Sequence, residues 1–184
     1  MKVLAAALLI GWSCFAGAAE RSIDAEVTVN AGIDMVWQTW ATTEGIKTFF
    51  APDGRVELRV DGRFEIYFNP LAEPGLRGAD DMRILAFQAP AMLSFTWNAP
   101  PHLAQARKQR THVTVRLEPA GTGQTRVSLR HVGWGTGGEW DQTYAYFSKS
   151  WPAVLANLKL RFDKGPMDWQ PWMDQLRKMQ AKPR

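Results

Sequence analysis

Three histidines are the side chains of this sequence best suited to acid–base chemistry near neutral pH. His131 follows Val127 and Leu129 at two-residue spacing, which places the three side chains on the inward face of a predicted strand. An inward imidazole needs a hydrogen-bond partner, and it can orient a ligand or transfer a proton. His131 is therefore the one weak candidate for catalysis, although a ligand contact and a structural role explain the same position.

The remaining polar residues show no pattern typical of catalysis or metal binding. His112 alternates with Val113 and so faces outward, and His102 lies in a proline-rich segment. The three histidines lack the short spacing of a metal site, so we predict neither a metal ion nor a cofactor. Asp80 and Asp81 are adjacent on a strand and point to opposite faces, which disfavours a paired-carboxylate mechanism. The sequence favours a binding protein over an enzyme.

The beginning of the chain has the pattern of a secretory signal peptide. A positive residue is followed by an uncharged apolar run at residues 3–17 and then by small residues. We therefore predict a signal peptide at residues 1–19 and a periplasmic or secreted protein. Cleavage after Ala18 or Ala19 removes Cys14, the only cysteine, so the mature chain has no thiol for disulfides, zinc or catalysis.

The composition is that of a folded domain with an excess of large aromatic residues. Hydrophobic residues make up 46% and charged residues 22% of the 184 residues, which excludes a disordered, collagen-like or disulfide-dense chain. Nine tryptophans and nine phenylalanines imply either a large aromatic core or a wide apolar pocket. The net charge of +4 is modest and an exported protein meets little nucleic acid, so we expect no nucleic-acid partner.

Alternating apolar residues predict an antiparallel meander with one covered face. A first strand at residues 22–30 precedes two short helices at residues 33–40 and 43–50, with Asn30 as the cap of the first helix. A turn at residues 52–54 leads into the other strands. These are predicted at residues 55–60, 62–69, 81–87, 92–98, 111–118 and 125–132.

Helical spacing dominates the C-terminal third of the chain. Apolar residues, most of them aromatic, recur every three to four positions over residues 139–162, which predicts a long helix. Pro152 should kink this helix or begin a second segment capped by Ser150. A short extra helix is predicted at residues 167–180. Residues 104–110, which lie between two strands, are basic and have no periodicity, so we predict a mobile loop there.

Several short motifs follow one another in a recognisable order. They are a helix ending in aromatics (residues 31–40), G-R-F (62–64), L-S-F-T-W (93–97), the hairpin strands at 111–117 and 123–131, and W-P-A-V-L-A-N-L (151–158). In this order they resemble the SRPBCC superfamily, whose members have the START-like, helix-grip fold. Within it, the chain looks most like the branch similar to activators of the heat-shock-protein ATPase.

The resemblance implies an α+β fold in which a curved antiparallel sheet of about six to seven strands wraps around a long C-terminal helix, with two short helices after the first strand. It implies a domain over residues 20–163 and leaves residues 164–184 as a helical extension. Members hold hydrophobic molecules in a mainly apolar cavity between sheet and helix. The residues that we predict to line such a ligand site are Phe49, Phe95, Trp97, His131, Tyr144, Phe147 and Trp151.

We therefore expect an exported protein that holds a hydrophobic small molecule or lipid, with eight tryptophans around the cavity and its mouth. Two alternatives use the same fold: an enzyme of the polyketide cyclase/dehydratase or hydrolase type with His131 as acid or base, and a protein-interaction module. Trp169 and Trp172 lie near basic residues of the tail, which suits contact with an anionic membrane, but we favour an ordinary solvated face. The sequence leaves the oligomeric state open.

Overall fold

The computed structural model describes residues 20–181, in which eight strands form two antiparallel sheets. The predicted signal peptide, residues 1–19, lies outside the described residues. The larger sheet has the strand order β1 (Ile23–Val29), β8 (Gln124–Val132), β7 (Thr111–Gly121), β6 (Met92–Trp97) and β5 (Ile84–Gln88). The smaller sheet contains β2 (Asp53–Val56), β3 (Phe64–Tyr67) and β4 (Gly78–Ala79). An isolated bridge between Arg63 and Arg83 links the two sheets.

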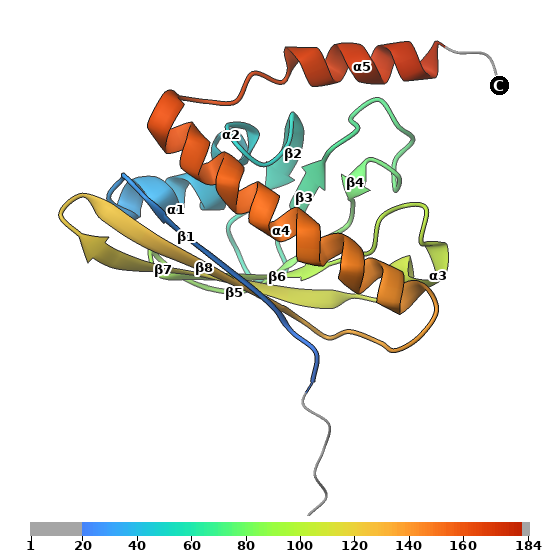
Figure 1. Ribbon diagram of the computed structural model, residues 1–184, viewed down its shortest axis with the longest axis horizontal. Helices are drawn as coiled ribbons and strands as arrows, with labels where there is room; N and C mark the ends of the chain where they lie inside the picture. The colour runs from blue at the N-terminus through green and yellow to red at the C-terminus, as the bar shows by residue number, and fades with distance from the viewer. Residues whose placement is uncertain (1–19, 182–184) are drawn as a thin grey trace, which may run out of the picture.

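The long helix α4 (Glu139–Lys164) lies across one face of the five-stranded sheet (Figure 1). The smaller sheet lies beside α4 in the same view. This arrangement confirms the predicted α+β helix-grip fold, in which an antiparallel sheet curves around a C-terminal helix. The strands are divided between two sheets because the chain leaves the larger sheet after β1 and returns to it only at β5.

The two short helices after β1 are present as predicted. They are α1 (Ile33–Ala41) and α2 (Thr43–Lys47). Asn30 is not the cap of α1: the cap position is Gly32, and the side chain of Asn30 instead bonds to α4 and β8. The cap of α2 is Thr42, whose hydroxyl oxygen accepts a backbone N–H three residues further along.

Helix α4 is continuous through Pro152, so the predicted second segment is wrong. Ser150 does not cap a new helix, because its hydroxyl donates back to the carbonyl of Tyr146 inside α4. Proline removes one backbone hydrogen bond from the helix. Trp151 and Leu155, which flank it, are both almost fully buried against the core, and this packing holds the helix together across the missing bond.

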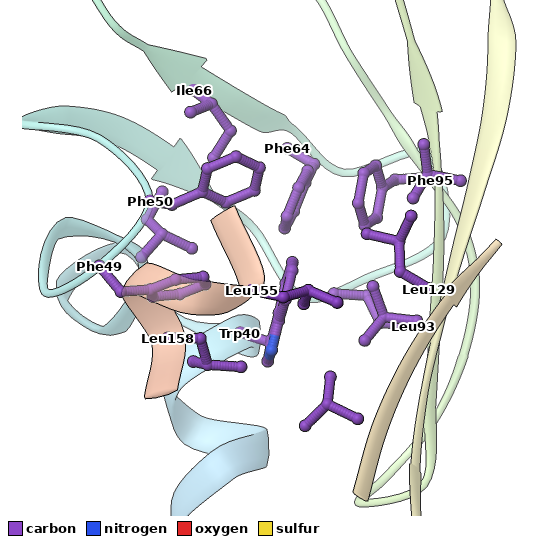
Figure 2. Close-up of a cluster of buried hydrophobic side chains, with 14 of the residues drawn as sticks. Trp40, Phe49, Phe50, Phe64, Ile66, Leu93, Phe95, Leu129, Leu155 and Leu158 are labelled. Atoms are coloured by element: carbon purple, nitrogen blue, oxygen red, sulfur yellow. The ribbon is translucent and has the colours of Figure 1, made fainter. Parts of the chain in front are cut away.

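The inward residues of β7 and β8 alternate with exposed ones, as their sequence predicts. Val113, Val115 and Leu117 pair in register with His131, Leu129 and Val127, and all six side chains are buried. Aromatic rings from several elements complete the core, with Phe64 and Phe95 stacked at a centroid distance of 4.0 Å (Figure 2). The aromatic excess of the sequence therefore supplies much of the core.

Two segments differ from their predicted structure. Asp53 begins β2 where we expected a turn at residues 52–54. Glycine is needed in that strand at Gly54, because a Cβ there would lie 2.5 Å from the carbonyl oxygen of Glu65 on β3. Residues 104–110 are not all loop, since their first four residues form the short helix α3 (Ala104–Arg107).

A partly buried ion pair connects α3 to the β4 region. Arg107 donates hydrogen bonds of 2.7 Å to the carbonyls of Gly75 and Gly78, and its guanidinium lies 3.6 Å from the Asp80 carboxylate. Arg77 donates to the same carboxylate at 2.8 Å. Burial raises the pKa of Asp80, but the hydrogen bonds from Arg77 and from two backbone N–H groups outweigh it and hold that pKa below its usual value.

The predicted extra helix is present as α5 (Gln170–Gln180). It lies on the side of α4 that faces away from the five-stranded sheet (Figure 1). Of its side chains, only Leu176 is buried, so α5 rests on the domain surface rather than in the core. None of the helices in the described part of the chain is both long and apolar enough to cross a membrane.

Candidate functional site

His131 is fully buried on β8 and is bonded to both neighbouring elements. Trp151 of α4 donates its indole N–H to Nδ1 at 2.8 Å, and Nε2 lies 2.6 Å from the hydroxyl of Thr111 on β7. Because Nδ1 accepts a hydrogen bond, Nε2 carries the proton and donates a hydrogen bond to the hydroxyl oxygen of Thr111. The Thr111 hydroxyl then donates to the carbonyl of Trp97 at 3.2 Å. Both imidazole nitrogens are thus satisfied within the protein.

The surroundings of His131 keep the imidazole neutral. Trp134 and Phe147 pack against the ring, with centroid distances of 4.1 and 5.3 Å. Burial, with a smaller contribution from His112, lowers the pKa of His131 to about 3. A proton on Nδ1 would also place two donors face to face at the Trp151 contact. In this structure His131 joins the sheet to α4, and neither nitrogen is available to a substrate.

The depressed pKa predicts that acid destabilises the fold. In the unfolded chain the pKa of His131 returns to about 6.5, so between about pH 6.5 and pH 3 only the unfolded state binds this proton. Stability is therefore fully present above pH 6.5 and falls by about 1.4 kcal/mol per pH unit below it. Urea unfolding at pH 7 and pH 5 should differ by about 2 kcal/mol.

A variant that cannot titrate provides the control for this pH dependence. His131→Gln keeps a donor and an acceptor in the side chain, so it should unfold with a much smaller difference between pH 7 and pH 5. An equal difference in the wild type and in His131→Gln would assign the pH dependence to other groups.

An open cleft runs between α4 and the β3–β4 region, and two residues that pack against His131, Phe147 and Trp151, line it. It consists of two adjoining parts of about 390 and 330 Å³, each within the size range of small-molecule sites. Both parts are lined by Phe68, Trp97, Tyr146 and Phe147. The part at α5 is also lined by Phe50, Trp151, Val154, Trp169 and Trp172. The part at α3 is also lined by Leu76, Asn98, Pro100, Pro101 and His102. We call the whole feature the aromatic cleft.

Exposed aromatic side chains are concentrated at this cleft. Within residues 20–181, four aromatic residues are exposed: Phe68, Phe87, Tyr146 and Trp172. All of them except Phe87 line the aromatic cleft. Aromatic rings left in water beside a cavity are typical of a binding surface, because burial by a ligand removes that apolar area from water.

The cleft lining contains one arginine, Arg77, whose charge is paired within the protein. The guanidinium of Arg77 lies 3.8 Å from the ring centroid of Tyr67 and is paired with Asp80. The Tyr67 hydroxyl in turn donates to the buried carboxylate of Glu65 at 2.9 Å. Burial and this carboxylate raise the pKa of Tyr67 to about 12. The cleft therefore presents an apolar surface with neutral polar groups, such as Asn98, at its α3 end.

Three of the seven predicted ligand-site residues line the aromatic cleft. Trp97 forms part of both regions, and Phe147 and Trp151 reach it from α4. Trp97 and Trp151 also contact one another, with ring centroids 5.2 Å apart. The structure thus brings together the residues of β6 and α4 that, in the sequence, only the family resemblance placed in one site.

The other four predicted residues lie outside the cleft lining. Phe49 and Phe95 are fully buried in the hydrophobic core, as Figure 2 shows. His131 is enclosed behind the aromatic residues that line the cleft. Tyr144 is partly buried and donates its hydroxyl to the carbonyl of Ser22, which ties α4 to the start of the domain.

The three exposed aromatic residues at the cleft were not among the predicted site residues. Tyr146 precedes the buried Phe147 and so lies off the periodic stripe of α4. Phe68 follows the four buried residues of β3, and Trp172 belongs to the extension. A position off the periodic stripe is a sequence signal for Tyr146 alone, because Phe68 and Trp172 follow the spacing of their predicted elements.

The residues that the structure describes contain no group of three histidine, cysteine, aspartate or glutamate side chains placed to hold a metal ion.

Comparison with solved structures finds the same fold in several bacterial proteins. Protein MLL2253 from Mesorhizobium loti has a TM-score of 0.62 and 22% identity, over 80% of this chain and 100% of that one. CalU16 from Micromonospora echinospora has a TM-score of 0.58 and 21% identity, over 87% and 83% of the two chains. A dimeric Aha1 from Colwellia psychrerythraea has a TM-score of 0.58 and 19% identity, over 79% and 98%. A comparison with curated proteins found no match.

A family model supplies the sequence relationship that these structural similarities lack. The model described as activator of Hsp90 ATPase homolog 1-like protein matches residues 30–163. This segment begins just before α1 and ends in the last turn of α4, so it contains both sheets except β1 and excludes α5. The chain therefore belongs to the activator of Hsp90 ATPase homolog 1-like family, within the SRPBCC superfamily of helix-grip proteins.

Proposed function

We propose that the protein is exported and holds a hydrophobic small molecule or lipid in the aromatic cleft. The observation that carries this proposal is the concentration of exposed aromatic rings there, where Phe68, Tyr146 and Trp172 surround a cavity. Covering an exposed aromatic cluster with a ligand lowers the free energy by roughly 25 cal/mol per Å² of apolar area removed from water. The size of each part suits a small molecule rather than a protein segment.

The buried histidine does not favour an enzyme. A general acid or base must reach the proton that it transfers, within hydrogen-bond distance or through one water. His131 makes its two hydrogen bonds to Trp151 and Thr111 and does not line the aromatic cleft. Its role in this proposal is structural, because it fixes Trp151 and, through Thr111, the strand that carries Trp97.

Titration with N-phenyl-1-naphthylamine, a neutral ring compound that fluoresces in apolar surroundings, tests the proposal. The purified domain should give a saturable increase in fluorescence with one site per chain, and native mass spectrometry should show the same ratio. A linear, unsaturable response and an unshifted native mass would contradict a ligand site in the cleft.

Export is supported by the charge and apolar run of residues 1–19. The two residues that follow are bonded to the folded domain: Glu20 accepts a hydrogen bond from the Gly133 N–H, and Arg21 pairs with Asp141 at 2.8 Å. N-terminal sequencing of the protein from the cell envelope or medium should give a chain that starts at Ala19 or Glu20. A chain that retains residues 1–19 would contradict cleavage and export.

A further inference from the structure

The extension beyond the family-matched segment contributes directly to the aromatic cleft. The family model ends at residue 163, whereas Trp169 and Trp172 both line the part of the cleft at α5. Trp172 is exposed to the same degree as Phe68, at 37% and 36%, and the two residues lie on opposite elements of the same cavity. Without the extension this part of the cleft would lack one aromatic wall.

Hydrogen bonds from the two indoles fix the extension over the cleft. Trp169 donates its indole N–H to the carbonyl of Lys47 at 2.6 Å, and Trp172 donates to the carbonyl of Phe68 at 2.7 Å. Further along α5, Gln180 donates to the carbonyl of Leu71 at 2.8 Å. Because each indole N–H is held by the domain, the rings have defined positions and contribute apolar surface to the wall.

No charged residue lines the part of the cleft at α5. Its lining consists of aromatic, aliphatic and small neutral residues: Phe50, Pro52, Phe68, Trp97, Tyr146, Phe147, Ser150, Trp151, Ala153, Val154, Asn157, Trp169 and Trp172. A carboxylate or phosphate head group in this part would lose its hydration without gaining a counter-charge. Rings from α4, β6 and α5 instead favour contact with another ring system.

We propose that α5 completes the ligand site and that Trp172 and Trp169 determine its specificity, selecting a neutral compound with a flat ring system. This inference rests on the proposed function, because it assigns the ligand class and one wall of the same cleft. It adds that the extension, although outside the family segment, is part of the binding site rather than a membrane anchor or an inert tail.

Two probes that share one ring system separate charge from shape. N-phenyl-1-naphthylamine is neutral, and 1-anilinonaphthalene-8-sulfonate carries the same rings with one sulfonate. The wild type should bind the neutral probe at least about tenfold more tightly, since the sulfonate would be desolvated without a partner. Trp172→Ala should weaken binding of the neutral probe about tenfold, and Trp172→Phe, which keeps a ring, should recover most of that loss.

Phe87→Ala is the matched control, because Phe87 is also an aromatic residue with 37% exposure but lies on β5 outside the cleft. It should bind the neutral probe like the wild type. Unchanged affinity in Trp172→Ala, or tighter binding of the sulfonate, would overturn the role of α5 while leaving the ligand site itself standing. Failure of the wild type to bind the neutral probe would overturn both proposals.

Discussion

Replacing His131 by alanine is expected to destabilise the folded protein by about 3–4 kcal/mol. The substitution leaves a cavity at a fully buried position and removes the partners of the Trp151 indole and the Thr111 hydroxyl. The Trp151 indole N–H, left without an acceptor, costs roughly 1–3 kcal/mol, and the Thr111 hydroxyl keeps only its bond to the Trp97 carbonyl. The lost ring packing adds to this cost. Since domains are stable by roughly 5–15 kcal/mol, the change is a large fraction of the total.

Urea unfolding at pH 7 measures this loss, with His112→Ala as the control. His112 lies on the neighbouring strand with its side chain exposed, so its replacement should change stability by no more than about 0.5 kcal/mol. If His131→Ala were as stable as His112→Ala, the hydrogen-bonded chain from α4 through His131 to β7 would contribute nothing measurable to the stability of the fold.

Filling the cleft is expected to abolish ligand binding without unfolding the protein. Ala153 is an exposed residue of α4 whose side chain lines the part of the aromatic cleft at α5. A phenylalanine there would place a ring in the 330 Å³ cavity and displace the bound molecule. Loss of roughly 2–3 kcal/mol of apolar contact corresponds to at least about thirtyfold weaker binding of N-phenyl-1-naphthylamine.

The same helix provides the control for that substitution. Ala156 is also exposed on α4, three residues after Ala153, and does not line either part of the cleft. Ala156→Phe adds the same ring to the same helix, so it should bind the probe like the wild type. Equal loss in both variants would point to a general effect on α4, and full binding by Ala153→Phe would place the ligand elsewhere.

Periodicity in the sequence predicts the main elements of the fold because it reflects burial on one face. The two-residue spacing of Val127, Leu129 and His131 correctly places all three side chains on the buried face of β8. The short elements β4 and α3 have no such pattern. They form where Asp80 meets Arg107, two residues far apart in sequence, and no local signal records that contact.

The ligand site is harder to predict because alternation shows on which face of a strand a side chain lies. It does not show whether that side chain is buried in the core or lines a cleft. Phe95 and Trp97 share a face of β6, yet Phe95 stacks on Phe64 in the core while Trp97 reaches the cleft. The difference arises from which element covers each residue. Trp172 could be recognised in the sequence as part of an extra helix, but its contact with Phe68 depends on the path of the chain after α4.

Ligand binding in the aromatic cleft can be followed at its own tryptophans, through the indole N–H signals in a ¹H–¹⁵N NMR titration with N-phenyl-1-naphthylamine. Four tryptophans line the cleft, namely Trp97, Trp151, Trp169 and Trp172. Four others of residues 20–181 do not, namely Trp37, Trp40, Trp134 and Trp140. If the ligand binds in the cleft, the signals of the first group shift on addition of the probe while those of the second group stay in place. Shifts confined to the second group, or equal shifts in both, would contradict binding in the cleft.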